Sequence, residues 1–227
     1  MSNVVIEGLK KDYRQGDIVV NALRGVDLTV EHGEFTALMG PSGSGKTTLL
    51  NIIGGLDDAT SGTCKVGDAD VASMSAAKRS DMRLRRLGFV FQSYNLIPVM
   101  SAEENAEFVL LLQGVPKAER QKKVRAMLDE VGLEGLYNRR PHELSGGQQQ
   151  RVAVARAIVS SPALVLADEP TANLDSHTSE ELIETMRKLN EDRGVTFLFA
   201  THDPLVMKHA RRIIKMRDGV VEEDTRR

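Results

Sequence analysis

The glycine-rich segment GPSGSGKT at residues 40–47 constrains this chain most, because it lies directly between two apolar runs. The run before it, residues 35–39, predicts a buried strand, and residues 45–54 predict a helix. Glycines at a strand-to-helix turn let the backbone curl until successive N–H groups point inward. The segment therefore predicts an α/β fold in which a tight turn presents main-chain donors at the end of a strand.

Such a turn attracts phosphate, because the inward N–H groups and the partial positive charge of the helix N-terminus both favour an anion. The pattern Gly-x-x-x-x-Gly-Lys-Thr is that of the nucleotide-binding P-loop, and the strand, spacing, lysine and threonine together disfavour a glycine turn that binds nothing. Lys46 is expected to reach the β- and γ-phosphates, and the Thr47 hydroxyl to bind Mg²⁺. The predicted nucleotide contacts are Gly40, Pro41, Ser42, Gly43, Ser44, Gly45, Lys46, Thr47 and Thr48.

Composition and charge exclude several classes of protein. The 227 residues are 41% hydrophobic and 27% charged, which is sufficient for a globular core, and the net charge of −2 gives no global attraction to nucleic acid or anionic lipid. No segment approaches the roughly 18 apolar residues of a membrane span. The one cysteine, Cys64, cannot form an internal disulfide, and no signal-peptide pattern is present. We therefore expect a cytosolic chain that something else anchors if it works at a membrane.

The N-terminal part should be largely β-structured. Its expected strands are residues 4–6, 18–23, 26–30 and 35–39, with a turn-rich strand pair at residues 62–71. Residues 76–87 predict a basic amphipathic helix, and no aromatic side chains interleave with its cations. These cations, expected to form a solvated face with no nucleic-acid partner, are Lys78, Arg79, Arg83, Arg85 and Arg86.

A helical segment separates this part from the C-terminal one. Helical periodicity dominates residues 102–160, with breaks at residues 114–116 and 138–141. Beyond it, compact apolar runs at residues 163–167 and 196–200 predict central parallel strands joined by a helix at residues 176–190. We therefore predict one domain over residues 1–227, whose α/β core (1–92 and 161–227) is interrupted by a helical insertion at about residues 93–160.

Two carboxylates follow the first of these central strands. Asp168 and Glu169 lie at its carboxyl end, where ligands of open α/β sheets gather. In isolation such a pair more often caps a helix or faces solvent. Because Lys46 and Thr47 already require a metal partner, we predict that Asp168 organises Mg²⁺ and that Glu169 polarises an attacking water.

The segment LSGGQ at residues 144–148 resembles the signature of the ATP-binding cassette (ABC) ATPases. Further motifs of that family follow the same order along the chain. Gln92 resembles the Q-loop glutamine, NLD at residues 173–175 the D-loop, and His202 the switch histidine. Tyr13 resembles the aromatic residue that stacks on adenine. The resemblance covers nearly the whole chain and implies a P-loop fold of the ABC-ATPase type, with an N-terminal antiparallel β subdomain and an inserted helical subdomain.

The resemblance implies that two copies pack head to tail around two ATP molecules. Ser145, Gly146, Gly147 and Gln148 precede or open a long helix and form a second anion site, which would close on the γ-phosphate held by Lys46 of the other copy. The alternative is a serine that merely caps this helix. Asp175 could cap the next helix and also contact the facing subunit.

The roles of Gln92 and His202 rest on the resemblance. Gln92, otherwise a polar residue at a strand end, would contact Mg²⁺ or the water. His202, otherwise a helix cap ahead of Pro204, would bond the γ-phosphate and hold Glu169 and the water. Tyr13 could equally be a packing residue. The implied reaction is ATP hydrolysis by in-line attack of water on the γ-phosphate.

The implied partners are a second copy of the chain and an integral membrane permease, with the chain held at the cytoplasmic face of the inner membrane. A surface near Gln92 and residues 94–104 would contact the permease. GFVFQSYNLIPVMSAEEN and THDPLVMKHARRIIKMRDG resemble the lipoprotein-release and macrolide-export ATPases. Amino-acid importers and the cell-division ATPase remain alternatives. A soluble DNA-repair or translation ATPase is a more remote one, since neither a coiled-coil insertion nor a second cassette is present.

Overall fold

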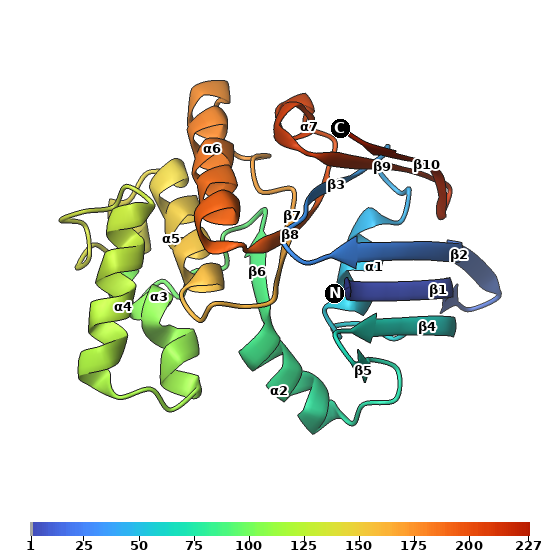
Figure 1. Cartoon of the computed structure of the whole chain (residues 1–227), viewed down its shortest axis with the longest axis horizontal. Helices are drawn as coiled ribbons and strands as arrows, with labels where there is room; N and C mark the ends of the chain where they lie inside the picture. The colour runs from blue at the N-terminus through green and yellow to red at the C-terminus, as the bar shows by residue number, and fades with distance from the viewer. Residues whose placement is uncertain (1) are drawn as a thin grey trace.

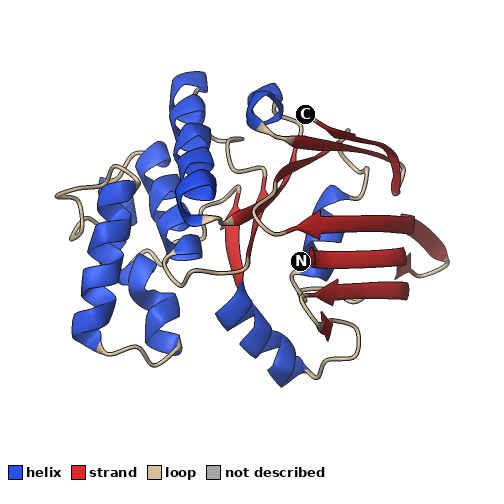
Figure 2. Ribbon diagram, in the orientation of Figure 1, coloured by secondary structure: helices blue, strands red, loops and turns tan. Residues whose placement is uncertain are grey.

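The computed structural model describes residues 2–227, and within them two sheets lie at an angle to each other (Figures 1 and 2). The larger sheet has the strand order β10-β9-β3-β8-β7-β6. All its neighbours pair in parallel except β9 and β10, which pair antiparallel. The strands are β3 (Phe35–Met39), β6 (Leu87–Phe91), β7 (Leu164–Asp168), β8 (Thr196–Thr201), β9 (Arg212–Arg217) and β10 (Val220–Arg226).

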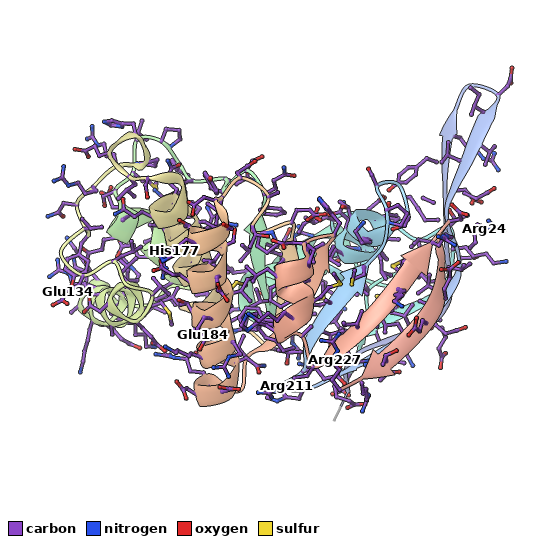
Figure 3. All side chains as sticks on the ribbon, turned by 90° about the horizontal axis from the view of Figure 1, so that it is seen from above. Arg24, Glu134, His177, Glu184, Arg211 and Arg227 are labelled. Carbon is purple, nitrogen blue, oxygen red and sulfur yellow. The ribbon has the colours of Figure 1, made fainter. Side chains whose placement is uncertain are left out.

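The smaller sheet is antiparallel, in the order β2-β1-β4-β5. Its strands are β1 (Ser2–Gln15), β2 (Ile18–Glu31), β4 (Ser61–Val66) and β5 (Ala69–Asp70). The predicted strands at residues 18–23 and 26–30 are one strand, because the register passes from Leu9 opposite Val26 to Lys10 opposite Arg24. Gly25, at φ 100°, is the extra residue of this bulge and does not end the strand. The β1–β2 hairpin extends beyond the body of the molecule (Figure 3).

Helices cover the larger sheet and also gather at one side of it. In Figure 1, α3, α4 and α5 lie on the side of the molecule opposite the antiparallel sheet. The boundaries of the helical insertion, about residues 93–160, stay a prediction. The helices are α1 (Lys46–Ile53), α2 (Ala76–Arg86), α3 (Ala102–Leu112), α4 (Lys117–Glu130), α5 (Gly146–Ile158), α6 (Ser176–Arg193) and α7 (Pro204–His209), with a 3₁₀ turn at Pro141–Glu143.

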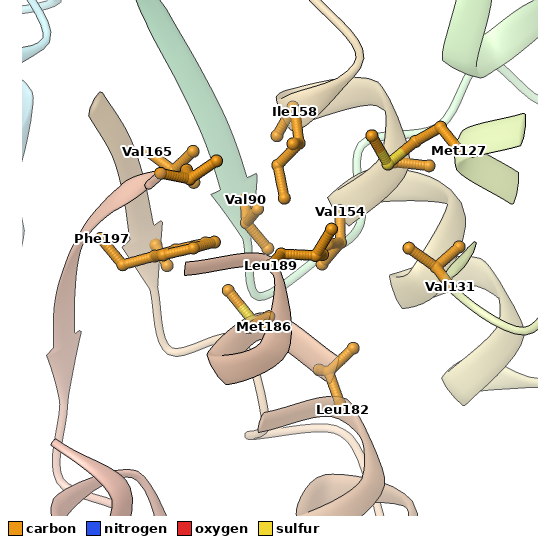
Figure 4. Packing of buried hydrophobic residues seen from close by; sticks show 14 of the residues in the cluster. Val90, Met127, Val131, Val154, Ile158, Val165, Leu182, Met186, Leu189 and Phe197 are labelled. Atoms are coloured by element: carbon orange, nitrogen blue, oxygen red, sulfur yellow. The ribbon is translucent and has the colours of Figure 1, made fainter. Parts of the chain in front are cut away.

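The parallel strands are buried on both faces, as their continuous apolar runs predict. Along β7, Val165 belongs to one hydrophobic cluster and Leu166 to the other, because successive side chains point to opposite faces. The first cluster packs Val165 and Phe197 against α5 and α6, including Met186 and Leu189 (Figure 4). The sheet is thereby fixed between two apolar layers.

This packing aligns the carboxyl ends of four parallel strands. Phe91 pairs with Asp168, Asp168 with Ala200, and Met39 with Thr201. The residues that follow these strand ends therefore meet along one edge of the sheet. In the described part of the chain, none of the helices combines the length and apolar character needed to cross a bilayer.

Candidate functional site

An open cavity of about 1020 Å³ lies at this edge of the sheet. Every residue of the segment 41–48 lines it, together with Tyr13, Gln92, Glu169 and His202. They come from the antiparallel sheet, from α1 and from the loops that follow β3, β6, β7 and β8. The structure thus brings most of the predicted site residues into one cavity large enough for a nucleotide.

The glycine loop has a shape that larger residues could not adopt. A Cβ on Gly40 would lie 2.1 Å from the Met216 carbonyl oxygen, and a Cβ on Gly45 would lie 2.6 Å from the Ala22 carbonyl oxygen. Gly40 and Gly45 also have φ angles of 154° and 99°. Two strands, β9 and β2, therefore press the loop into its curl, which explains why glycine is needed at both positions.

The N-terminus of α1 is open to a ligand. Gly45 is its N-cap, no described side chain caps it, and its first turn carries no acidic residue. The Ser44 hydroxyl is buried and has no hydrogen-bond partner among the described residues. Lys46 Nζ donates to the carbonyl oxygens of Gly40 (2.7 Å) and Pro41 (3.1 Å), so its charge lies inside the loop. Free N–H groups, an unpaired hydroxyl and an ammonium group together suit a phosphate.

Thr47 and Asp168 meet next to this loop. Thr47 Oγ1 donates to Asp168 Oδ1 at 3.1 Å. Burial raises the pKa of Asp168, and the nearby Glu169 charge raises it further, while the Thr47 bond opposes both effects. A divalent cation would relieve this cost by compensating the buried charge. A hydroxyl and a carboxylate beside a phosphate loop fit Mg²⁺, which commonly takes few protein ligands and completes its shell with phosphate oxygens and water.

Glu169 is held in an uncommon backbone conformation. Its φ is 45°, and its amide donates to the Ala200 carbonyl oxygen at 2.8 Å. Its carboxylate accepts a bond from Thr201 Oγ1 at 2.9 Å and lies 2.6 Å from His202 Nδ1. The Glu169 side chain is only 18% exposed, whereas the His202 side chain is 74% exposed. Both side chains line the cavity. The cap of α7 is Asp203, which excludes the alternative of a helix-capping His202.

Tyr13 lines the same cavity from β1. It is 41% exposed, and its hydroxyl donates to Asp57 Oδ2 at 2.6 Å. Lys11 Nζ lies 4.7 Å from the centre of the ring and also bonds Asp57 at 2.5 Å. Burial and the Asp57 carboxylate raise the pKa of Tyr13. These bonds fix the ring as a platform, so Tyr13 is not a core packing residue.

Gln92 follows β6 and contributes an exposed side chain to the cavity. Its carbonyl oxygen accepts a bond from Asn173 Nδ2 at 2.9 Å. Asn173 belongs to the segment NLD that follows Glu169 in the chain. The loop after β6 is therefore tied to the loop after β7.

The signature segment lies in a second cavity of about 530 Å³, which Ser145, Gly147 and Gln148 line. Ser145 caps α5 in a reciprocal capping box, accepting from the Gln148 amide at 3.2 Å and donating its own amide to Gln148 Oε1 at 2.9 Å. A Cβ on Gly146 would lie 2.9 Å from the Tyr94 hydroxyl oxygen. None of these residues lines the larger cavity, so the chain does not bring Ser145 to Lys46.

Asp175 caps α6, as the first of its two predicted roles requires. Its side chain accepts from the Thr178 amide at 3.0 Å and from Thr178 Oγ1 at 2.6 Å. Backbone and hydroxyl donors lower the pKa of Asp175, the Thr178 hydroxyl most. Its predicted contact with a facing subunit stays a prediction.

Sequence reasoning missed several residues that shape the site. Thr201 bonds Glu169, Thr171 Oγ1 donates to Asp203 Oδ2 at 2.5 Å, and Asp57 anchors Tyr13. Thr201 could have been found from the sequence, because it ends the strand directly before His202 and so lies at the same edge of the sheet. Asp57 could not, because it is 44 positions from Tyr13 and lies in a loop.

Comparison with known proteins agrees with this geometry. Residues 23–172 match the ABC transporter family. The macrolide export ATP-binding/permease protein MacB of Syntrophobacter fumaroxidans is 48% identical over 99% of this chain and 32% of its own length. This chain therefore spans about a third of the length of that relative. The lipoprotein-releasing system ATP-binding protein LolD of Anaeromyxobacter dehalogenans is 46% identical over 97% of this chain and 93% of LolD.

Solved structures agree as well. A dimeric structure of MJ0796, a bacterial ABC transporter cassette, matches with a TM-score of 0.91 and 40% identity, over 98% of both chains. A dimeric post-hydrolysis state of MJ0796 bound to ADP and Pi matches with the same TM-score and 41% identity, also over 98% of both chains. The predicted fold class is therefore confirmed. Together with the family match over residues 23–172, these similarities establish that the chain belongs to the ABC transporter family as an ATP-binding cassette ATPase.

Proposed function

We propose that the larger cavity binds ATP with Mg²⁺ and hydrolyses it, in a head-to-tail dimer that drives a membrane-embedded transporter. The observation that carries this proposal is the 2.6 Å contact between His202 Nδ1 and Glu169 Oε1 in the cavity that also holds the glycine loop. A carboxylate held by an imidazole at a phosphate loop is suited to activating water.

The residues around the loop would bind and orient the nucleotide. The amides of the loop and of the α1 N-terminus donate to phosphate oxygens, and Lys46 Nζ turns from the Gly40 and Pro41 carbonyls to the β- and γ-phosphates. Tyr13, fixed by Asp57, offers its ring face to adenine. Thr47 and Asp168 hold the cation, which supplies charge neutralisation between the phosphates when bound.

Glu169 would accept the proton of the attacking water. Thr201 and His202 hold its two carboxylate oxygens, so the water that it activates is aligned with the γ-phosphate. The exposed edge of His202 then donates to a γ-phosphate oxygen and absorbs developing charge. Gln92 reaches the same position from the loop after β6, beside the cation or the water.

The separation of the two cavities supports a dimer. Ser145 and Gly147 line the second cavity, and Lys46 does not. The N-terminus of α5 offers a second anion site there. In a head-to-tail pair, Ser145 of one copy would complete the γ-phosphate site of the other. ATP would then stabilise the dimer by mass action, because it binds both partners. The second role of Asp175 is a contact across this interface.

We assign the chain to transporters of the lipoprotein-release or macrolide-export type, in keeping with the names of its relatives. Under this assignment the chain lies at the cytoplasmic face of the membrane and contacts a permease. The surface near residues 92–104 suits that contact, because Val99 is 76% exposed and lies between Gln92 and α3. Closure of the dimer would move this surface and transmit work to the permease.

Affinity capture of a Glu169→Gln variant tests the proposal. The tagged protein is purified in mild detergent with ATP and Mg²⁺, and the captured proteins are identified. The amide cannot accept the proton, so hydrolysis should stop while nucleotide binding and dimerisation continue. A membrane protein with a large extracytoplasmic domain is the expected partner. A many-span permease would indicate import, and soluble partners, DNA or ribosomes alone would refute the transporter assignment.

A further inference from the structure

Gln150 connects the signature helix to both loops of the ATP site. It lies on α5, two residues after the signature segment, and is completely buried. Its Nε2 donates to the Pro170 carbonyl oxygen at 2.6 Å and to the Phe91 carbonyl oxygen at 3.3 Å. One amide group therefore joins three segments that are distant in the sequence.

The two carbonyl groups belong to the neighbours of proposed reacting groups. Pro170 directly follows Glu169, and Phe91 directly precedes Gln92. The Phe91 carbonyl group shares a rigid planar peptide unit with Gln92, so a shift of that carbonyl group moves Gln92. The Pro170 carbonyl group is joined to the Glu169 peptide unit through the proline ring, which fixes φ, so a shift there also reaches Glu169. Gln150 therefore contacts the neighbours of Glu169 and Gln92 and does not line the nucleotide cavity.

Arg156, six residues further along α5, adds a second connection to the same region. Its guanidinium donates to the carbonyl oxygens of Tyr94 at 2.9 Å and Asn95 at 2.6 Å. Tyr94 and Asn95 have φ angles of 56° and 50°, an uncommon conformation for side-chain-bearing residues. Burial lowers the pKa of Arg156, which shows that this charge is held at a desolvation cost. Gln150 and Arg156 of α5 therefore hold the chain on the two sides of Gln92.

The two polar atoms of the Gln150 amide differ in their bonding. Its Oε1 is buried and has no partner among the described residues. An unsatisfied buried acceptor destabilises a fold, whereas an apolar side chain of similar length would avoid that cost. The two bonds of Nε2 are what such a replacement would lose. The hydrogen bonds of the Gln150 side chain therefore go to the two loops.

We propose that Gln150 is a positioning residue for hydrolysis, which couples the position of α5 to Gln92 and Glu169. When Ser145 at the α5 N-terminus engages a γ-phosphate on the facing copy, the resulting shift of α5 reaches the other nucleotide through Gln150. The inference rests on the proposed ATP site and adds a route between the two sites of a dimer.

The test compares Gln150→Met with Gln149→Met. Both replacements remove an amide from neighbouring positions of α5. Among the described residues, however, Gln149 Nε2 bonds only the nearby Leu144 carbonyl oxygen, at 3.1 Å. For Gln150→Met we expect kcat to fall about 10- to 100-fold, because small misplacements of reacting groups cost this much. The KM for ATP should stay within about twofold, since the binding loop is untouched. Gln149→Met should retain both values.

A second comparison separates positioning from general destabilisation. In a Gln92→Ala background, Gln150→Met should have a smaller effect on kcat than in the wild type, because residues that act through one another are not additive. If Gln150→Met fails to fold, Gln150→Leu, which also removes the amide donors and introduces no buried charge, replaces it in the same cycle. Unchanged kcat, or fully additive effects, would refute the inference. Glu169→Gln is measured in parallel, and if it keeps full ATPase activity, the proposed site itself fails.

Discussion

His202 Nδ1 and Glu169 Oε1 lie 2.6 Å apart, although the two residues follow different strands and are separated by 33 positions. The parallel pairing of β7 with β8 creates this proximity, since Asp168 lies opposite Ala200. Glu169 then departs from the strand with φ 45°, and this turn directs its carboxylate toward the histidine. The contact is therefore a consequence of sheet register and one left-handed residue.

Replacing His202 with alanine should lower kcat for ATP hydrolysis about 100-fold or more, because a positioned proton-transfer and charge-stabilising group is lost. ATP affinity should change little, since the loop residues bind the phosphates. The control is His177→Ala, at an exposed position on α6 (Figure 3). Steady-state ATPase assays and a nucleotide titration measure both effects. An H202A enzyme with more than half of the wild-type kcat would contradict the role given to this histidine.

Gly147→Ala should destabilise the protein by about 1–3 kcal/mol, because the new Cβ would lie 2.3 Å from Thr178 Cγ2. Thr178 cannot rotate away freely, since its hydroxyl bonds Asp175 at 2.6 Å. Adding Thr178→Ser removes the clashing methyl group and keeps that bond. The double variant should therefore recover most of the lost stability in urea unfolding. Equal destabilisation with and without Thr178→Ser would show that this clash is not the cause.

Asp224 should contribute pH-dependent stability through Arg212. The Arg212 guanidinium bonds both oxygens of Asp224, at 2.8 and 2.6 Å, and lowers the pKa of that carboxyl group. A lowered folded-state pKa stabilises the protein above the ordinary value of about 3.9, and this contribution is lost as pH falls through the folded-state value.

The Asp224→Asn variant should consequently unfold at lower urea concentration than the wild type at pH 7, and the difference should shrink below about pH 4. The matched control is Asp192→Asn, at an exposed position of α6, for which the midpoint should stay near that of the wild type at both pH values. A difference at Asp224 that persists unchanged at low pH would exclude an ionic origin.

Cys64 should be unreactive in the native protein. The side chain is 1% exposed in β4, and burial raises the pKa of its thiol to about 12. At pH 8 the thiolate is therefore scarce as well as inaccessible, and a disulfide reagent such as DTNB should modify the protein only in denaturant. One equivalent of rapid reaction under native conditions would refute this expectation.

The sequence predicted those parts of the molecule whose structure depends on residues that are adjacent in the chain. The segment 40–47 was identified because its glycines, lysine and threonine are contiguous, and the strands β7 and β8 because they are continuously apolar. β10 was missed because its side chains are half-buried or exposed, so it carries no apolar pattern. β9 begins with Arg212, whose burial depends on Glu34 and Asp224 from distant segments.

At the site, the hydrogen bonds between segments that are distant in the sequence could not be predicted either. The attachment of Gln150 to Phe91 spans 59 positions, and no local pattern distinguishes this glutamine from Gln149. The same holds for the bond from Asn173 to Gln92, which spans 81 positions. Periodicity and motifs report on burial and on contiguous loops, whereas these contacts are set by tertiary packing.

The presence of two separate cavities in one chain also predicts how mutant copies would combine in a dimer. In the proposed head-to-tail pair, each nucleotide touches the glycine loop of one copy and the signature segment of the other. A copy with a damaged Ser145 would therefore leave its own nucleotide in a sound site and disable that of its healthy neighbour. Mixed with copies that lack Lys46, it would form heterodimers with one doubly damaged site and one fully intact site. Where one intact site supports hydrolysis, two such alleles, each inactive alone, would complement each other when combined.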